Sequence, residues 1–156
     1  MIRFLLLSAA LAGCGPSTPE PSADAEACEH LQEGPNVAVT ATAAATGAPS
    51  VGTEHTRFDV TLIDVTGGKG GSVSFASEHE ADHVVFLSEE VVLKVKDGAG
   101  AEVALESSAA SSADCALVKG RHVVDLGVGT YTFSFGPTTK TSVQLVIEVD
   151  EAAHEH

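Results

Sequence analysis

The chain of 156 residues has little positive charge and few large aromatic side chains. It contains 8 lysines and arginines against 22 aspartates and glutamates, for a formal net charge of −14, and it has one tyrosine and no tryptophan. Such an acidic surface repels nucleic-acid phosphates, and no basic stripe offsets the repulsion, so we expect no nucleic-acid partner. No uncharged apolar run approaches the roughly 20 residues of a membrane-spanning helix. The length and a hydrophobic content of 44% fit a single domain with one core.

The N-terminus has the pattern of an export signal. Arg3 precedes a short apolar stretch and a run of small residues that leads to Cys14, which is typical of a signal peptide over residues 1–13. The motif Leu11-Ala12-Gly13-Cys14 resembles the lipobox of bacterial lipoprotein precursors. The resemblance implies a mature chain that begins at an acylated Cys14 and is held to a membrane of the cell envelope, because two or three acyl chains anchor firmly. Gly15, by similarity to enterobacterial lipoproteins, favours the outer membrane over the inner one.

The rest of the chain divides into three parts. Residues 14–22 contain three prolines among small polar residues and predict a stiff, lipidated tether. Residues 23–149 form the predicted folded domain, and residues 150–156 form a polar tail that contains histidine and glutamate. An ordinary secretory signal with an incidental cysteine is the alternative interpretation of the N-terminus.

Apart from one helical pattern, the folded part has the periodicity of strands. Residues 23–33 predict a short helical turn, with Gly34-Pro35 as the stop signal. Alternating apolar runs then predict strands near 36–43, 54–65, 71–77, 83–87, 91–97, 102–106, 121–126, 130–136 and 142–149. Short strands with one apolar face each predict an all-β fold, an antiparallel two-sheet sandwich. A lipocalin-like barrel is the alternative.

One segment of this region has a weak family likeness. Residues 125–133 resemble the turn and tyrosine that begin a late strand of immunoglobulin-like or cupredoxin-like domains, over about nine residues and without functional content. The likeness implies a sandwich of one of these two types and nothing about activity.

Two cysteines remain after Cys14 is assigned to lipidation. Cys28 and Cys115 are an even number of cysteines, and the export signal predicts an oxidising compartment for them. We therefore expect a disulfide that closes a loop of 87 residues and stabilises the fold by about 4 kcal/mol. The alternative is a free Cys28 that acts as a metal thiolate beside His30.

Histidine is abundant and lies next to acidic residues. The seven histidines nearly equal the eight basic residues, and most of them adjoin a glutamate, as in Cys28-Glu29-His30 and Glu54-His55. Imidazole nitrogen and carboxylate oxygen together suit a divalent transition metal such as zinc or copper. The candidate ligands are His79 and His83 in one segment and His154 and His156 at the C-terminus. Histidines that are simply exposed at the surface are the competing interpretation.

The segment from His79 to His83 matches H-E-x-x-H, the zinc-peptidase signature, which requires a helix. The strand patterns on both sides argue against a helix, and we therefore expect no catalysis and no enzyme. The sequence favours a membrane-anchored envelope lipoprotein that binds a transition metal. The alternative is a non-catalytic adhesion or scaffold module that contacts another envelope protein.

Overall fold

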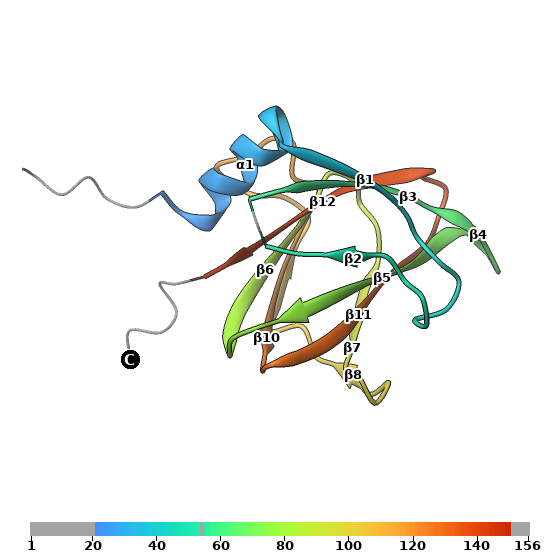
Figure 1. Ribbon diagram of the computed structural model, residues 1–156. Helices are drawn as coiled ribbons and strands as arrows, with labels where there is room; N and C mark the ends of the chain where they lie inside the picture. Colours follow the sequence, from blue (N-terminus) through green and yellow to red (C-terminus); the bar gives the residue numbers. More distant parts are fainter. Residues whose placement is uncertain (1–20, 54, 151–156) are drawn as a thin grey trace, which may run out of the picture.

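The structure is a computed structural model, and it describes residues 21–53 and 55–150. The predicted signal peptide, the lipidation site Cys14 and the tail histidines His154 and His156 lie outside the described residues. Figure 1 shows one helix packed against the outside of two layers of strands.

The helix α1 (Ala23–Glu33) spans the predicted helical residues. Ser22 caps its N-terminus, because the Ser22 hydroxyl accepts a hydrogen bond from the Ala25 amide. The helix ends at Gly34, whose φ of 78° is a left-handed conformation that glycine adopts readily. The sequence therefore predicted both the position and the end of this element.

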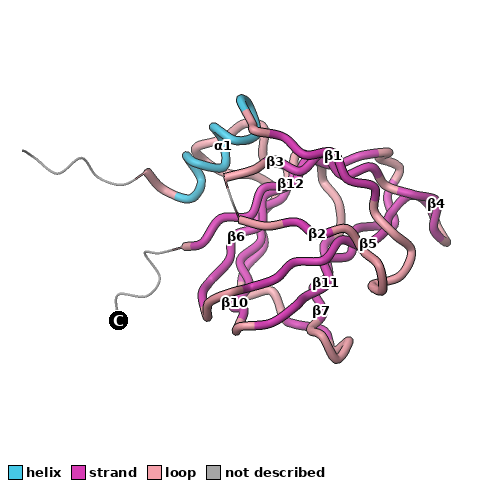
Figure 2. The backbone as a smooth tube through the Cα atoms, in the orientation of Figure 1, coloured by secondary structure: helices cyan, strands magenta, loops and turns pink. Residues whose placement is uncertain are grey.

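Twelve strands follow among the described residues. They are β1 (Asn36–Thr40), β2 (Ser50–Val51), β3 (Arg57–Thr61), β4 (Ile63–Val65), β5 (Gly68–Ser77), β6 (Ala81–Leu87), β7 (Leu93–Lys96), β8 (Glu102–Val103), β9 (Ser107–Ala109), β10 (Gly120–Leu126), β11 (Gly129–Thr138) and β12 (Ser142–Val149). Figure 2 shows how the strands dominate the chain between short loops. The all-β prediction is confirmed.

The strands form two sheets that face each other as a sandwich. The first sheet has the order β1-β3-β12-β6-β10-β9, and the second has the order β2-β5-β11-β7-β8, with β4 paired to β5. The predicted two-sheet sandwich is confirmed, and most of its strand pairs are antiparallel, while two pairs, β1 with β3 and β2 with β5, are parallel. The chain leaves the first sheet after β1, contributes β2 to the second sheet and returns as β3 in the direction of β1. Such a connection allows parallel pairing, which a tight hairpin does not.

The first sheet is covered on both faces. Its inner face packs against the second sheet around the fully buried residues Phe75, Phe133 and Leu145. Its outer face packs against α1 through a smaller cluster that consists of Ala27, Leu31, Val84, Phe86, Cys115, Val118 and Val146. Because successive side chains of a strand point to opposite faces, the continuous apolar run of β6 serves both cores.

The tyrosine near the start of β11 forms a hydrogen bond with the turn before this strand. Tyr131 lies in β11, and its hydroxyl donates a hydrogen bond of 3.1 Å to the carbonyl of Gly127. A tyrosine that bonds to the backbone a few residues upstream is a recurring corner of immunoglobulin-like sandwiches. This contact ties the turn before β11 to the strand.

The helical content adds one negative finding. Among residues 21–53 and 55–150, no helix is long and apolar enough to cross a membrane.

Candidate metal site

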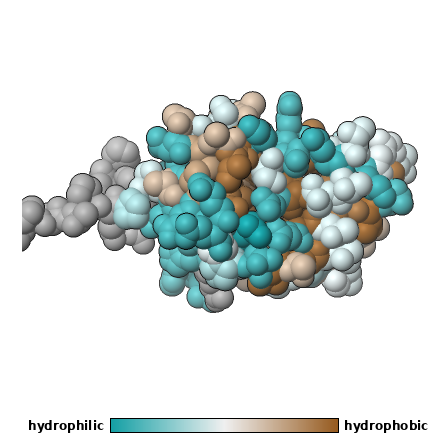
Figure 3. Space-filling model, turned by 90° about the horizontal axis from the view of Figure 1, so that it is seen from above, coloured by the Kyte–Doolittle hydropathy of each residue, from teal (hydrophilic) through white to brown (hydrophobic). Residues whose placement is uncertain are grey.

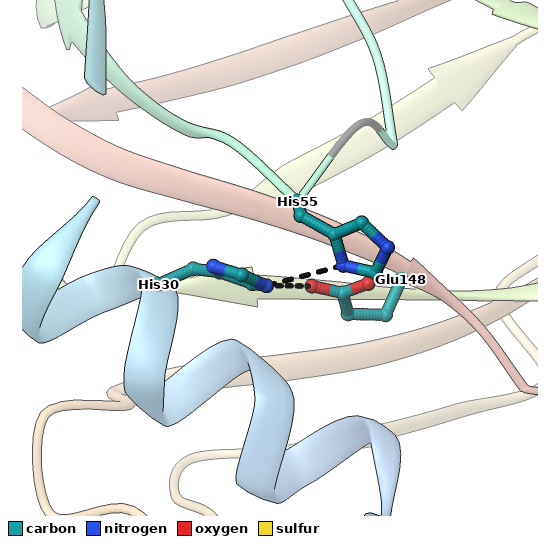
Figure 4. Close-up of side chains that lie close together, drawn as sticks. All are labelled: His30, His55 and Glu148. Atoms are coloured by element: carbon teal, nitrogen blue, oxygen red, sulfur yellow. Dashed lines mark hydrogen bonds and ion pairs between the residues drawn. The ribbon is translucent and has the colours of Figure 1, made fainter. Parts of the chain in front are cut away.

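Three potential ligand side chains converge where α1 meets the first sheet (Figure 4). His30 comes from the last turn of α1, His55 from the loop between β2 and β3, and Glu148 from β12. One nitrogen or oxygen atom of each lies within 4.8 Å of the corresponding atom of the other two. Within the described parts of the chain, this is the one group of three histidine, cysteine or acidic side chains that meets this distance.

His30 is placed by the packing of the helix. Ala27 and Leu31 are buried against the first sheet, so the residue between them in the last turn lies at the edge of that contact, with its side chain 13% exposed. Its Nδ1 lies 3.5 Å from the Gly34 carbonyl oxygen. When Nδ1–H donates to a backbone carbonyl, the lone pair of Nε2 is left for a metal. The Nε2 atom is the one that faces His55 and Glu148.

His55 reaches the site from an exposed loop. Its φ of 46° lies in the left-handed region, which few residues other than glycine occupy. The His55 amide donates a hydrogen bond of 2.6 Å to the carbonyl of Thr53, which holds the tight turn. From this turn, His55 Nδ1 lies 3.2 Å from His30 Nε2, with the two rings tilted by 51°. The loop thus directs the exposed imidazole of His55 toward α1.

Glu148 is the buried member of the group. It lies on the face of β12 that α1 covers, and only 3% of its surface is exposed. Its Oε1 is 3.7 Å from His30 Nε2, and it accepts no hydrogen bond from any described residue. Burial raises the pKa of this carboxyl to about 8, and the negative charge of Glu26 is the second cause. The fold therefore buries the Glu148 carboxyl group at a position where its ionised form is unfavourable.

The spacing of the three atoms fits a small cation. In a tetrahedral zinc site with bonds of about 2.0 Å, neighbouring ligand atoms are about 3.3 Å apart. The distances of 3.2 Å between the two imidazoles and 3.7 Å between His30 and Glu148 lie close to that value. A cation between the three atoms also provides the interaction that Oε1 of Glu148 otherwise lacks. The residues present therefore fit a divalent metal.

The helix that carries His30 is attached at three points, two of them on strands of the first sheet and one on the loop between β9 and β10. Arg121 forms an ion pair of 3.0 Å with Asp24 near the N-terminus of α1. The disulfide between Cys28 and Cys115 holds the middle, with 5.4 Å between the two Cα atoms. Arg57 donates a hydrogen bond of 3.0 Å to the Leu31 carbonyl near the C-terminus. These attachments fix His30 relative to β12.

The disulfide prediction is confirmed, and the alternative of a free Cys28 as a metal thiolate is wrong. A sulfur atom in a disulfide has no thiolate to offer a metal. His30, which that alternative placed beside Cys28, belongs instead to the group with His55 and Glu148.

The segment of the predicted ligands His79 and His83 is not helical. His79 is exposed in the turn between β5 and β6, while His83 lies in β6 and is only 3% exposed. The His83 ring packs edge-on against Phe75, its Nδ1 lies 2.9 Å from the Ala81 carbonyl oxygen, and burial lowers its pKa. The H-E-x-x-H match thus falls on a turn and a strand, as its flanking pattern predicted. Neither histidine joins a group of three ligands among the described residues.

His122 is partly buried in β10. Its Nδ1 lies 2.9 Å from the Ser108 hydroxyl, and burial lowers its pKa. Its Nε2 is buried without a partner among the described residues, yet no acidic or histidine group gathers around it there. It remains a single interior histidine.

Sequence reasoning noted His30 and His55 as members of acidic clusters and missed Glu148 altogether. Glu148 alternates with Leu145, Ile147 and Val149, so it lies on the face of β12 opposite to theirs. The available signal was Val146, an apolar residue on that same side, which indicates that a further element covers it. Only the docking of α1 shows that Glu148 is buried.

No protein-family model matches the chain, and no curated protein matches it either. The chemistry of the candidate site therefore has to be argued from its geometry.

Proposed function

We propose that this protein is an envelope lipoprotein, anchored through an acylated Cys14, whose sandwich domain binds a divalent transition metal at His30, His55 and Glu148. The role is binding, for storage, delivery or sensing of the metal, and not catalysis. The outer membrane is the proposed location, on the resemblance of the Cys14 segment to a lipobox followed by glycine.

One observation carries the metal assignment. Glu148 is buried to 3% exposure, has an oxygen atom without a hydrogen-bond partner among the described residues and lies beside two imidazoles. A buried charge without a partner costs several kcal/mol, and such groups are normally paired or bound to a metal. A cation at this position turns an unfavourable carboxylate into a ligand.

The donor set selects among metals. Two imidazole nitrogens and one carboxylate oxygen suit zinc and copper(II), whereas the hard ions calcium and magnesium prefer oxygen ligands alone. Because both cysteines of the domain are in the disulfide, no thiolate is present at the site to favour copper(I). Zinc and copper(II) are therefore the proposed ions.

The test is a calorimetric titration of the full-length protein, purified in detergent, with Zn²⁺ and with Cu²⁺ at pH 7.5. The variant His154→Ala/His156→Ala serves as the parent, so that the tail does not contribute binding. We expect one site with a Kd below about 10 μM, equivalent to roughly 7 kcal/mol of binding free energy. In this parent, Glu148→Gln and His30→Ala abolish that site.

His79→Ala is the matched control, because this histidine is exposed and lies outside the group of three. It leaves the affinity unchanged. If His79→Ala removes binding while Glu148→Gln retains it, the metal is held by the His79 and His83 segment. If the parent binds neither ion, the proposed metal function is refuted.

The membrane anchor is tested separately. Cells that express the protein are labelled with radioactive palmitate, and Cys14→Ser is the control. Label in the wild-type protein and none in the variant supports the anchor, while an unlabelled wild-type protein refutes it.

The adhesion or scaffold alternative is supported by a different feature. Among the described residues, β1 is an edge strand with one hydrogen-bonded neighbour, and Val37 in it is 45% exposed. A free edge can pair with a strand of another protein. The face seen in Figure 3, however, shows hydrophobic areas interrupted by hydrophilic side chains. This alternative predicts that His30→Ala and Glu148→Gln leave every partner contact intact.

A further inference from the structure

One continuous segment of this acidic chain carries no charge. Residues 34–53 contain no acidic or basic side chain and no histidine, although 19% of the whole chain is aspartate, glutamate, lysine or arginine. The segment forms β1, β2 and the connection between them (Figure 1). Among the described residues, β1 and β2 are edge strands of the first and the second sheet. A protein of net charge −14 thus has an uncharged strand at one edge of each sheet.

β1 is the longest of the edge strands in the described part of the chain. It has five residues, whereas the edge strand β9 has three and the edge strands β2 and β8 have two each. Four of the five residues of β1 are exposed, and its register with β3 runs without a bulge. Edge strands are usually protected from pairing by a charge, a bulge, a proline or shortness. Within β1, none of these is present.

The hydrogen bonds to β3 show which backbone groups of β1 point outward. At one end of the pair the Arg57 amide donates a hydrogen bond to the Pro35 carbonyl. At the other end the Ala41 amide donates to the Thr61 carbonyl. In a parallel pair, every second residue of a strand directs its backbone groups to the same neighbour. The odd-numbered residues of β1 therefore bond to β3, and the even-numbered residues direct their amide and carbonyl groups away from it.

We propose that β1 pairs in antiparallel orientation with β1 of a second copy of this chain, so that the first sheets of two molecules join across a twofold axis at Ala38. Residues whose backbone groups point toward the partner form the hydrogen-bonded pairs of an antiparallel ladder, with about 5.5 Å between their Cα atoms. Ala38 then pairs with Ala38 of the second copy, and Asn36 pairs with Thr40. The proposal is independent of the metal site.

The side chains of β1 are complementary to themselves in this register. Val37 then lies opposite Val39 of the second copy, on the face where the neighbouring Phe58 and Val60 of β3 enter the core. Val39 already packs against that core, while Val37 is 45% exposed. Cross-strand pairs of β-branched residues stabilise a sheet. The second copy therefore covers the exposed valine and extends the apolar face of the first sheet.

The distribution of charge favours a second copy as the occupant of this edge. Two molecules with a net charge of −14 repel each other, so they associate best where both surfaces are uncharged. The adjacent strand does not oppose the contact, because Asp59 of β3 forms an ion pair with Arg57 and accepts a hydrogen bond from Asn36. A strongly charged partner finds no opposite charge on residues 34–53. Salt screens the repulsion between the two acidic molecules and therefore strengthens the dimer.

The test is native mass spectrometry of the full-length protein, purified in detergent, at protomer concentrations up to about 100 μM, which detects a Kd in the micromolar range. We expect a dimer whose fraction increases with the concentrations of protein and of ammonium acetate. Ala38→Glu weakens the dimer by about tenfold or more, because two carboxylates then face each other across the axis. Ala109→Glu is the matched control, because it adds the same charge to β9, the exposed strand at the other edge of the same sheet. It leaves the dimer intact.

A charge exchange tests the twofold register. Ala38→Lys also weakens its own dimer, and an equimolar mixture of Ala38→Glu and Ala38→Lys forms a heterodimer, because opposite charges then face each other. A peptide tag on one of the two variants gives the heterodimer a mass of its own. Circular dichroism of each variant confirms that it is folded.

Three results overturn the proposal. A wild-type protein that stays monomeric over the whole range of protein and salt concentrations leaves the β1 edge to a partner of different sequence. A dimer that persists unchanged in Ala38→Glu is formed through another surface. An equal loss of the dimer in Ala38→Glu and Ala109→Glu, without a heterodimer in the mixture, attributes the loss to net charge alone. None of these results affects the metal titration.

Discussion

Replacement of Glu148 by glutamine is expected to stabilise the fold while it abolishes the metal site. Burial raises the pKa of Glu148 from 4.5 to about 8, so the folded chain binds more protons than the unfolded chain between these values. The free energy of unfolding then falls as the pH rises through this window. At about 1.4 kcal/mol per pKa unit, the cost is about 3 kcal/mol at pH 7 and about 5 kcal/mol above pH 8. Glutamine has the shape of the protonated acid and carries no charge, so it removes this cost.

The assay is urea denaturation followed by circular dichroism, with EDTA and without reductant, at pH 5, 7 and 8. The difference between Glu148→Gln and the wild type is expected to grow with pH in favour of the variant, because all other titrating groups are common to both proteins. Glu29→Gln, an exposed control, shows no such trend. If Glu148→Gln is no more stable than the wild type at pH 8, burial of the Glu148 carboxylate does not destabilise the fold. The main argument for a bound cation is then lost.

Three further predictions concern the scaffold. The variant Cys28→Ser/Cys115→Ser loses about 4 to 5 kcal/mol of unfolding free energy in urea titrations, because the constraint on an 87-residue loop disappears; an unchanged midpoint contradicts this. Burial lowers the pKa of His83 from 6.5, so the unfolded chain takes up the proton first as the pH falls below 6.5 and stability is lost there. In thermal melts between pH 5 and 6.5, the melting temperature of His83→Gln is expected to fall less with decreasing pH than that of the wild type. An equal pH dependence of the two melting temperatures contradicts this prediction. Phe86→Ala, beneath α1, costs about 3 to 5 kcal/mol, and the exposed Val92→Ala costs less than about 0.5 kcal/mol; similar losses for both contradict the helix-covered core.

Much of the fold followed from local patterns. The helix began and ended where the capping and stop signals placed it, and the longer strands lie within or close to their predicted ranges. The predicted strand 54–65 is in fact two elements, because β3 pairs with β12 in the first sheet and β4 pairs with β5 in the second. Residues 50–51 and 107–109 were not predicted as strands. Segments of two or three residues are too short to show a period, and only their pairing partners make them strands.

The amino-acid sequence by itself determined the class of the fold, the position of α1 and the pair of cysteines that form the disulfide, because each depends on local periodicity, capping residues or the count of a rare residue type. The tertiary structure alone decided which histidines have an acidic partner. His30, His55 and Glu148 lie in three separate parts of the chain, and they meet only because α1 covers the outer face of β12. That contact also decides that Glu148 is buried, since the face of a strand that meets solvent and the face that meets a helix have the same spacing in sequence.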